Sequence, residues 1–409
     1  MSVLSPPAPP TATGGEAWRG YEALLADRST PCAFVDLDAM WSNAEAMLHR
    51  AGRLPIRVAT KSVRCRALLS RIASHNARFR GFMTFTLAET IWLAEHGATD
   101  LLLAYPTTDV AALRRLGDLD RASAPVLMVD CVEHLDLIVS ATGSPSYPVR
   151  VCIDLDMGYQ RAWGRLAFGP KRSPVRTPEQ ARRLATEVLR RPELDLAGVM
   201  GYEGHIAGVG DRPLGRPLRG LGIAAAQRRW TIDVSERRRA MVEAVRQVAP
   251  LRIVNGGGTG SLHLTSRESA LTEVAAGSGF FAPTLFDSYR AFRLRPAAMF
   301  VLPVVRRPSD AVATVLGGGY LASGAATADR LPQPYLPTGL RLDGLEGAGE
   351  VQTPLRGKAA RGLHIGDHVY FRHAKAGELC ERFNTLLLLQ GGRIVDEVPT
   401  YRGEGMAFL

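Results

Sequence analysis

Lysine is scarce in this chain of 409 residues. Of the 50 basic residues only four are lysines, namely Lys61, Lys171, Lys358 and Lys375. An arginine keeps its proton and cannot form an imine with a carbonyl group, so covalent amine chemistry is limited to these four side chains. Lys61 directly follows a short β-branched run, Ile-Arg-Val-Ala-Thr, whereas Lys171 and Lys358 lie in loop-like stretches. The end of a strand favours a buried, reactive amine, and we therefore expect Lys61 to be the chemically important lysine.

Cysteines are few, and long apolar runs are absent. The five cysteines are odd in number and show no paired spacing, which is typical of reduced thiols in a cytoplasmic protein. No apolar run approaches the ~18 residues that a membrane span needs. The first ten residues lack the basic segment and apolar core of a signal peptide. We expect a cytoplasmic protein with no membrane partner.

Aromatic residues are also sparse, at 7% of the chain, although the formal net charge is +10. The arginines are scattered, many of them along expected polar helix faces, and few aromatic residues lie between them. This pattern argues against nucleic-acid binding, which needs a concentrated basic surface. The positive charge still suits a small anionic ligand.

From residue 30 onward, short apolar runs alternate with amphipathic stretches of helical length. This rhythm predicts βαβ units around a parallel sheet. Eight runs over about 250 residues match the size of a closed (β/α)₈ barrel, with a doubly wound open sheet as the alternative. The expected strands are Arg57–Thr60, Gly81–Thr84, Leu101–Ala104, Val126–Val129, Val149–Ile153, Gly198–Gly201, Arg252–Val254 and Thr272–Ala276. The expected helices include Leu37–Ala51, Thr86–His96, Asp109–Leu116, Cys131–Ser140, Pro178–Arg190 and Val234–Val248.

After about Arg290 the rhythm changes to strand-like runs joined by segments rich in glycine and proline. These runs are Met299–Val305, Ala313–Leu316, His368–Phe371, Thr385–Leu389 and Arg393–Glu397. We expect a tail and lead-in over residues 1–29, disordered up to about residue 15, a barrel over 30–290 and a mostly β domain over 291–409. The early run Cys32–Asp36 precedes the barrel proper and is also a candidate strand of the β domain.

Two glycine-rich segments follow the last two expected barrel strands. The first contains Asn255, Gly257, Gly258 and Thr259, and the second is Gly277-Ser278-Gly279. Such segments let backbone amides approach an anion, and barrel enzymes commonly bind phosphate after strands seven and eight. The sequence therefore predicts a phosphate site there.

Other polar residues follow the fifth and sixth expected strands. Arg161 lies in Asp-Met-Gly-Tyr-Gln-Arg, and Tyr202 and His205 lie in Gly-Tyr-Glu-Gly-His. Alternatively, Arg161 is a solvated helix residue and His205 has a structural role. A lysine, an arginine, an aromatic ring, an imidazole and a phosphate site on one barrel rim suit pyridoxal 5′-phosphate.

The chain resembles the fold-type III pyridoxal-phosphate enzymes, in the branch of D-threonine aldolase and D-serine dehydratase that is related to alanine racemase. The resemblance covers most of the chain and rests on six motifs in the family's order: TPCAFVDLDAMWSNAEAM, VATKSVRC, DMGYQRAWG, GYEGH, NGGGTGS and GSGFF. It implies that Lys61 is the Schiff-base lysine and that Arg161 faces the pyridine nitrogen, which a permanently charged arginine keeps unprotonated.

The resemblance also implies a divalent metal, zinc or manganese, that grips the substrate's β-hydroxyl from the β domain. The branch uses a histidine followed two residues later by cysteine or aspartate. Here an alignment on Asn384 selects Glu378 and Cys380, whereas an alignment on the histidine selects His373. Thiolate, carboxylate and imidazole are adequate zinc ligands, but Cys380 and His373 are equally compatible with buried structural roles.

We therefore expect a lyase that acts on D-configured β-hydroxy amino acids, by aldol cleavage or by dehydration, with His205 as an acid or base. Alternatives are an amino-acid racemase, with Tyr320 as the second base, and a non-catalytic pyridoxal-phosphate-binding protein. The family implies a homodimer. Arg290 and Arg372 are both candidates for binding the substrate carboxylate.

Overall fold

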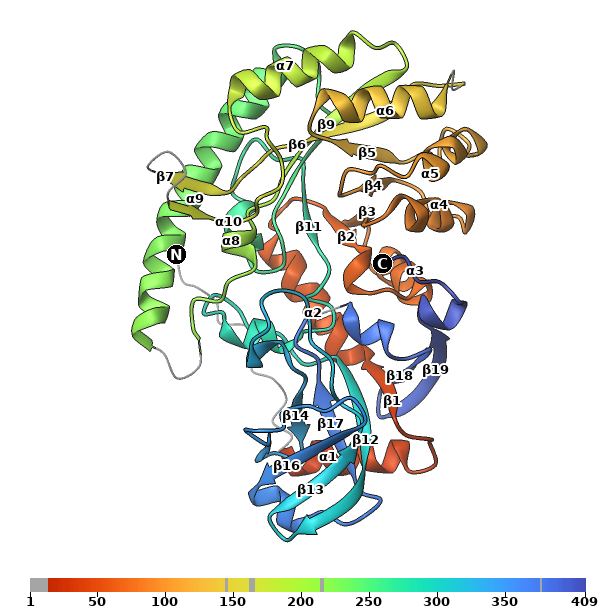
Figure 1. Ribbon diagram of the computed structural model, residues 1–409, viewed down its shortest axis with the longest axis vertical. Coiled ribbons are helices and arrows are strands. Elements are labelled where there is room, and N and C mark those ends of the chain that lie inside the picture. Colours follow the sequence, from red (N-terminus) through yellow and green to blue (C-terminus); the bar gives the residue numbers. More distant parts are fainter. Residues whose placement is uncertain (1–13, 144–145, 162–165, 214–216, 376) are drawn as a thin grey trace. The chain divides into compact units, whose positions relative to one another are not determined.

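The computed structural model describes residues 14–143, 146–161, 166–213, 217–375 and 377–409 (Figure 1). The chain forms two compact units. The barrel unit consists of Glu45–Gly279, Ser288–Phe292 and Ala407–Leu409. The β unit consists of the chain up to Ala44, Phe280–Asp287 and Arg293–Met406.

In the part of the chain that the structure describes, eight parallel strands close into a barrel. They follow the order β10-β11-β2-β3-β4-β5-β6-β9 around the barrel. All eight expected strands are confirmed, and the open sheet is excluded. The strands are β2 (Ile56–Ala59), β3 (Phe79–Thr84), β4 (Leu101–Leu103), β5 (Val126–Val129), β6 (Val149–Asp154), β9 (Leu194–Gly201), β10 (Ile253–Gly256) and β11 (Glu273–Ala276).

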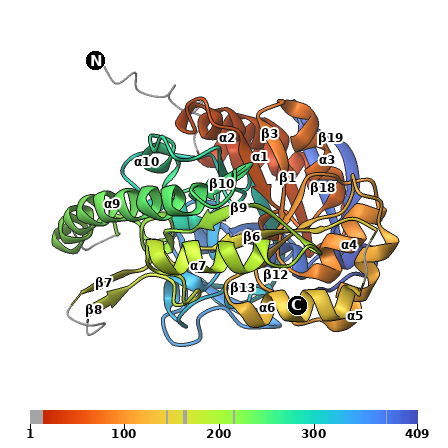
Figure 2. The same ribbon diagram turned by 90° about the horizontal axis from the view of Figure 1, so that it is seen from above.

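Helices surround these strands on the outside (Figure 2). They include α3 (Arg66–His75), α4 (Leu87–Glu95), α5 (Val110–Arg114), α6 (Val132–Thr142), α7 (Pro178–Leu189), α8 (Gly204–Ala207), α9 (Pro217–Arg246) and α10 (Leu262–Thr265), while α2 (Leu37–Arg50) runs from one unit into the other. Helix α7 shows why such segments are helical: Thr177 and Gln180 form a reciprocal capping box, and Ala181, Leu184 and Val188 bury one face. The described residues contain no helix with the length and apolarity of a membrane span.

Helix α9 is longer than the sequence predicts. It begins at Pro217, whereas the periodic pattern places its start at Val234. The first half is mostly exposed and has Gly220 as its one buried residue, so it carries little of the apolar periodicity on which the prediction depends. Before it, β7 (Tyr159–Arg161) and β8 (Leu166–Phe168) form a two-stranded antiparallel hairpin.

A buried ion group lies in the barrel wall. Arg57 is only 2% exposed and binds both carboxylate oxygens of Glu273, at 2.6 Å and 2.8 Å. The same guanidinium also donates to a carboxylate oxygen of Asp100 at 2.9 Å, and the amide of Asn255 donates to Glu273 at 2.7 Å. Because the charges compensate one another, the barrel can bury them.

The β unit contains a nine-stranded sheet among its described residues. The strands are β1 (Cys32–Asp36), β12 (Ala298–Ser309), β13 (Val312–Leu316), β14 (Gln333–Leu336), β15 (Leu340–Leu342), β16 (Gln352–Gly357), β17 (His368–Arg372), β18 (Thr385–Gln390) and β19 (Arg393–Pro399). The five strands expected after residue 290 are confirmed, and β14, β15 and β16 are additional. These three are short or interrupted by proline, which weakens a strand signal in the sequence.

Strand β1 belongs to this sheet, which confirms that the run Cys32–Asp36 is a strand of the β domain. It pairs antiparallel with β12 and parallel with β18. Helix α1 (Gly14–Leu25) was not predicted; it packs on the same unit, where Trp18 Nε1 donates to the His368 carbonyl at 3.2 Å. Most of the expected disordered tail, residues 1–13, lies outside the described residues, and its last two residues, 14 and 15, are helical.

Candidate active site

Lys61 lies at the carboxyl-terminal end of β2, in a single 3₁₀ turn over Thr60–Ser62. The hydroxyl of Thr60 fixes this turn by donating to the Met83 carbonyl at 3.1 Å. The Lys61 amine bonds to the hydroxyl of Tyr105, 2.7 Å away, and Tyr105 follows the end of β4. The lysine side chain is exposed, rather than buried as the sequence suggested. A ligand with a carbonyl group can therefore reach its amine.

Burial raises the pKa of Tyr105. The charge of Lys61, the hydrogen bond between Lys61 and Tyr105, and the charge of Arg172 together lower this pKa by more. The net effect is a tyrosine with a lowered pKa beside the amine. Sequence reasoning missed Tyr105, although its place directly after the expected strand Leu101–Ala104 was a usable signal.

The two glycine-rich segments lie together on the same rim. Strands β10 and β11 are parallel neighbours, and the Gly279 amide donates to the Thr259 hydroxyl at 3.2 Å. Gly277 also packs against the turn that holds Lys61, because a Cβ added to it would lie 2.6 Å from the Ala59 carbonyl oxygen and 2.9 Å from Ser62 Cβ. Both segments and the lysine thus occupy adjacent strand ends.

A buried carboxylate, Glu203, fastens the first glycine-rich segment. It accepts hydrogen bonds from the Gly257 amide at 3.2 Å and the Ser261 hydroxyl at 2.8 Å. It also binds the guanidinium of Arg238 at 2.6 Å. Arg238 is fully buried and binds Glu268 as well. The Ser261 hydroxyl is therefore engaged by Glu203.

Tyr202 and Arg172 face the same segment. A Cβ added to Gly258 would lie 3.2 Å from Tyr202 Cε2, so the ring packs closely against this loop. The guanidinium carbon of Arg172 lies 5.5 Å from the ring centroids of both Tyr202 and Tyr105. Burial raises the pKa of Tyr202 to about 12, so the hydroxyl keeps its proton at neutral pH. Sequence reasoning missed Arg172, which no periodic or strand-end signal indicates.

Asp154 ends β6 and is 7% exposed. Burial raises the pKa of its carboxyl to about 7, and the charge of Asp130 adds to the shift. Asp130 and Asp154 follow neighbouring parallel strands whose last paired residues are Val129 and Ile153. A carboxyl with a pKa near neutrality can both donate and accept a proton at physiological pH. Sequence reasoning did not single out Asp154, although it directly follows the expected strand Val149–Ile153.

His205 lies on α8 and is buried. Its ring packs edge-on against Trp230, with centroids 5.2 Å apart, and a Cβ added to Gly169 would lie 2.7 Å from its Nδ1. Burial lowers the pKa of His205 to about 4, so the ring is neutral at pH 7. Its role as acid, base or cofactor contact stays a prediction.

Three further predicted cofactor residues differ in how the structure presents them. Arg161 ends β7, but its side chain lies outside the described part of the structure, so its pairing with a pyridine nitrogen stays a prediction. The side chain of Asn255 lies in the barrel wall, where its amide donates a hydrogen bond to Glu273. Ser278 lies between the two glycines of the second segment.

The predicted metal ligands belong to the β unit. Cys380 and Glu378 lie in one 3₁₀ turn. Burial is the main cause that raises the pKa of Tyr320, and the charges of Glu378 and Cys380 raise it further. Glu378 accepts a hydrogen bond from the Ser323 amide at 2.9 Å. His373 is completely buried, and burial lowers its pKa to about 3. A neutral imidazole is the form that binds metals.

A different cluster meets a simple distance criterion for a metal site. Within the described ranges, Asp130, Cys131 and His134 are the group of three or more such side chains whose donor atoms all lie within 4.8 Å of one another. His134 Nδ1 lies 3.0 Å from a carboxylate oxygen of Asp130, so an ion pair already accounts for part of this proximity. The three predicted ligands His373, Glu378 and Cys380 do not form such a group.

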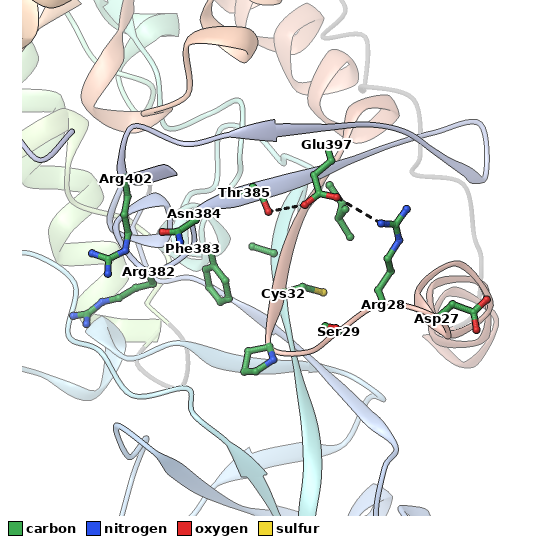
Figure 3. Close-up of a pocket in the computed structure, with 13 residues that line it drawn as sticks. Asp27, Arg28, Ser29, Cys32, Arg382, Phe383, Asn384, Thr385, Glu397 and Arg402 are labelled. Carbon is green, nitrogen blue, oxygen red and sulfur yellow. Dashed lines mark hydrogen bonds and ion pairs between the residues drawn. The ribbon is translucent and has the colours of Figure 1, made fainter. Parts of the chain in front are cut away.

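The β unit also has a polar pocket of about 610 Å³, distinct from the residues around Lys61 (Figure 3). One wall carries Glu397, which pairs with Arg28 at 3.5 Å and accepts a hydrogen bond from Thr385 at 2.9 Å. Burial raises the pKa of the Cys32 thiol in this pocket to about 11. The thiol is therefore protonated at neutral pH and is a poor nucleophile.

Comparisons with known proteins agree with this architecture. The family model described as alanine racemase, N-terminal domain, matches residues 35–283. No curated protein matches the sequence. Among solved structures, D-threonine aldolase from Filomicrobium marinum is similar with a TM-score of 0.77 at 19% identity, covering 93% of this chain and 96% of that one.

Two other solved structures have the same fold. D-threo-3-hydroxyaspartate dehydratase from Delftia sp. HT23 has a TM-score of 0.71 at 20% identity, covering 92% of this chain and 98% of that one. Alanine racemase of Clostridium difficile 630 has a TM-score of 0.60 at 13% identity, covering 91% and 100%. At these identities the likeness establishes the fold. The family model spans more than half of the chain, and the chain therefore belongs to the family of the alanine racemase N-terminal domain.

Proposed function

We propose that this protein is a pyridoxal-phosphate-dependent lyase that acts on D-configured β-hydroxy amino acids. The reaction is aldol cleavage to glycine and an aldehyde, or dehydration and deamination to a 2-oxo acid. The observation that carries the proposal is the exposed Lys61 amine at the end of β2, beside two glycine-rich segments that are tied together through Thr259 and Gly279. An amine next to a phosphate cradle is the donor set that this cofactor requires.

The residues present fit the cofactor. Lys61 supplies the amine, and the segments at Gly257–Thr259 and Gly277–Gly279 supply backbone amides for the phosphate. Gly258 and Gly277 have no room for a Cβ without moving Tyr202, Ala207 or Ala59. When bound there, pyridoxal phosphate would supply a carbonyl group that reacts with amines and a ring that withdraws electrons from the bonds at the substrate's Cα.

The protein's own groups then position the amine and handle protons. Tyr105 holds the Lys61 amine through its hydroxyl and, with its lowered pKa, can exchange a proton with it. Asp154, with a pKa of about 7, can hold or release a proton at its carboxylate oxygen on the same rim. His205 is neutral and can accept a proton at whichever of its two ring nitrogens carries no hydrogen.

A divalent metal, zinc or manganese, in the β unit completes the proposal. Candidate ligands are His373, Glu378 and Cys380, and the metal's role would be to polarise the substrate's β-oxygen. The similar solved structures include a D-threonine aldolase and a mutant of D-threo-3-hydroxyaspartate dehydratase in its metal-free form. We also propose a homodimer, on the basis of the family resemblance alone, and a cytoplasmic location, on the basis of the few unpaired cysteines.

The absorbance spectrum between about 300 and 500 nm tests the cofactor assignment. We expect a band near roughly 410–420 nm in the wild type and none in Lys61→Ala. Lys171→Ala is the matched control, because Lys171 is an exposed lysine in a loop, and it should keep the band. A wild type that stays colourless after addition of pyridoxal phosphate rules the assignment out.

Assays with D-threonine and D-serine then separate the two reactions. Glycine and acetaldehyde from D-threonine indicate an aldolase, whereas pyruvate and ammonia from D-serine indicate a dehydratase. Loss of either activity with a chelator, and its return with zinc or manganese, supports the metal. Conversion of D-alanine to L-alanine without either lyase activity contradicts the proposal.

A further inference from the structure

The loop after β8 holds Arg172 at the carboxyl-terminal rim of the barrel. The next residue, Ser173, is 4% exposed, and its hydroxyl donates to the Asp154 carbonyl at 2.6 Å. The same hydroxyl accepts from the Val175 amide at 3.0 Å, and the Val175 carbonyl accepts from the Asp156 amide at 2.8 Å. The loop is therefore fastened to the end of β6, and the position of Arg172 is set by the barrel.

The guanidinium of Arg172 rests between two aromatic rings and not on an acid. It lies 5.5 Å from the centroids of Tyr105 and Tyr202, within the range of a cation–π contact. Across the residues that the structure describes, no carboxylate lies within ion-pair distance of Arg172. Its side chain is exposed, so its hydrogen-bond donors are open to a ligand.

The two arginines that the sequence offered for binding the substrate carboxylate, Arg372 and Arg290, already contact aspartate residues. Arg372 binds both carboxylate oxygens of Asp287, at 2.7 Å and 2.9 Å. Arg290 donates to the Asp211 carbonyl at 3.2 Å and lies 3.9 Å from its carboxylate. Arg172 differs from both because no ion pair within 4.0 Å is found for it among the described residues, although its charge acts on the Asp154 carboxyl and lowers that group's pKa.

Arg172 also lies near the reactive amine. The Lys61 nitrogen and the Arg172 guanidinium carbon lie 5.4 Å and 5.5 Å from the centroid of the same Tyr105 ring, so the two cations are within about 11 Å of each other. An α-amino acid carries its carboxylate one carbon away from its amine. With hydrogen bonds of about 2.8 Å at each end, such a molecule spans a gap of this order.

We propose that Arg172 binds the α-carboxylate of the amino-acid substrate while the substrate's amine is held at the Lys61 position. The inference rests on the proposed function and adds a substrate-binding residue to it. A guanidinium suits this task because its planar fork matches a carboxylate and stays charged at every working pH. The glycine-rich segments are assigned to the phosphate of the cofactor, so Arg172 is available to bind a second anionic group.

Equilibrium binding to the cofactor-loaded enzyme tests this role. The ligands are D-alanine, which has no β-hydroxyl and is therefore no substrate for either lyase reaction, and its amino alcohol, D-alaninol, which lacks the carboxylate; the cofactor absorbance reports the dissociation constant. We expect the wild type to prefer D-alanine by about 10- to 100-fold, as for a hydrogen bond to a charged group. In Arg172→Ala the preference should fall to near unity, with a partial recovery in Arg172→Lys.

The control is Lys171→Ala, which removes the same charge from the adjacent residue and should keep the full preference. A preference that persists in Arg172→Ala overturns the proposal. So does an equal weakening of both ligands, because it indicates a contact with the cofactor or a structural role.

The protein without cofactor gives an independent readout. Arg172 is one of the charges that lower the pKa of Tyr105, so propionate bound at Arg172 should raise that pKa in an ultraviolet titration of the wild type. Arg172→Ala should show no response, and Tyr105→Phe identifies the signal. If the wild type binds no pyridoxal phosphate, the proposed function fails, yet this titration still decides the carboxylate site. No response to propionate in the wild type overturns it.

Discussion

The substitution Glu203→Gln tests whether a buried carboxylate holds the phosphate segment in place. Glu203 accepts from the Gly257 amide and the Ser261 hydroxyl and pairs with the fully buried Arg238. Glutamine keeps the shape of the side chain but loses the charge. It also presents an N–H donor to a set of groups that are themselves donors.

The expected cost is about 3 kcal/mol. Removing one partner of a buried ion pair typically costs about 3–5 kcal/mol, and the lower end applies here because Arg238 keeps Glu268 as a second partner. A change of this size increases the population of the open segment roughly a hundredfold. The affinity for pyridoxal phosphate should fall in parallel, because the amides around Gly257 and Gly258 lose their fixed positions.

Hydrogen exchange measured by mass spectrometry reports this change locally. Peptides covering residues 255–265 should exchange faster in Glu203→Gln. The matched control is Glu268→Gln, which removes a carboxylate from the same arginine but does not touch Gly257 or Ser261 in the contacts described above. It should accelerate exchange in that segment much less.

The pH dependence supplies a second check. Burial raises the pKa of Glu203, but the Arg238 charge and the hydrogen bonds from Thr265 and Ser261 lower it by more, so the net shift is downward. A carboxyl with a lowered folded-state pKa contributes stability that is fully present above its unfolded value of about 4.3 and is lost as the pH falls through the folded value. The difference between wild type and variant should therefore shrink below about pH 4. Equal exchange in the two variants at pH 7 would refute the reasoning.

Three further outcomes are expected. Gly277→Ala should destabilise the barrel by about 1–3 kcal/mol in thermal unfolding, because the new Cβ meets the Ala59 carbonyl, whereas Gly222→Ala, in open space on α9, should be neutral or stabilising. Tyr105→Phe should remove an early component from an ultraviolet pH titration, because the nearby cations lower the pKa of Tyr105; an unchanged curve contradicts the geometry. Metal analysis of Cys380→Ser should show loss of a bound zinc or manganese, and loss in Cys131→Ser alone would instead place the metal at the cluster of Asp130, Cys131 and His134, between β5 and the start of α6.

The barrel was predictable because its strands are short apolar runs that recur at regular spacing. The rim residues that directly follow strands, Lys61, Tyr202 and the glycine-rich segments, were predictable for the same reason, since strand order alone brings them to one edge. Tyr105 obeys the same rule and was available to it. The helical first half of α9 was not, because it has no buried apolar stripe and Gly220 is its one buried residue.

Other parts of the site depend on contacts between residues far apart in the chain. Glu203 matters through Arg238 and Ser261, and nothing in the sequence near Glu203 indicates that pairing. Arg172 reaches the rim because Ser173 bonds to the end of β6, after a hairpin that has no periodic signal. The metal ligands were ambiguous because two alignments of one short stretch select different side chains.

Strand β1 makes the β unit discontinuous in sequence. It lies between β12 and β18 in the sheet. Residues near position 34 can therefore form their strand pairs only after residues near 300 and 387 have been synthesised. The barrel residues in between form their own contacts earlier, at lower cost in loop closure. During synthesis the barrel can therefore fold first, while strand β1 is still unpaired. A fragment that starts at residue 291 would lack a central strand of its own sheet, and we expect it to aggregate unless residues 14–44 are supplied.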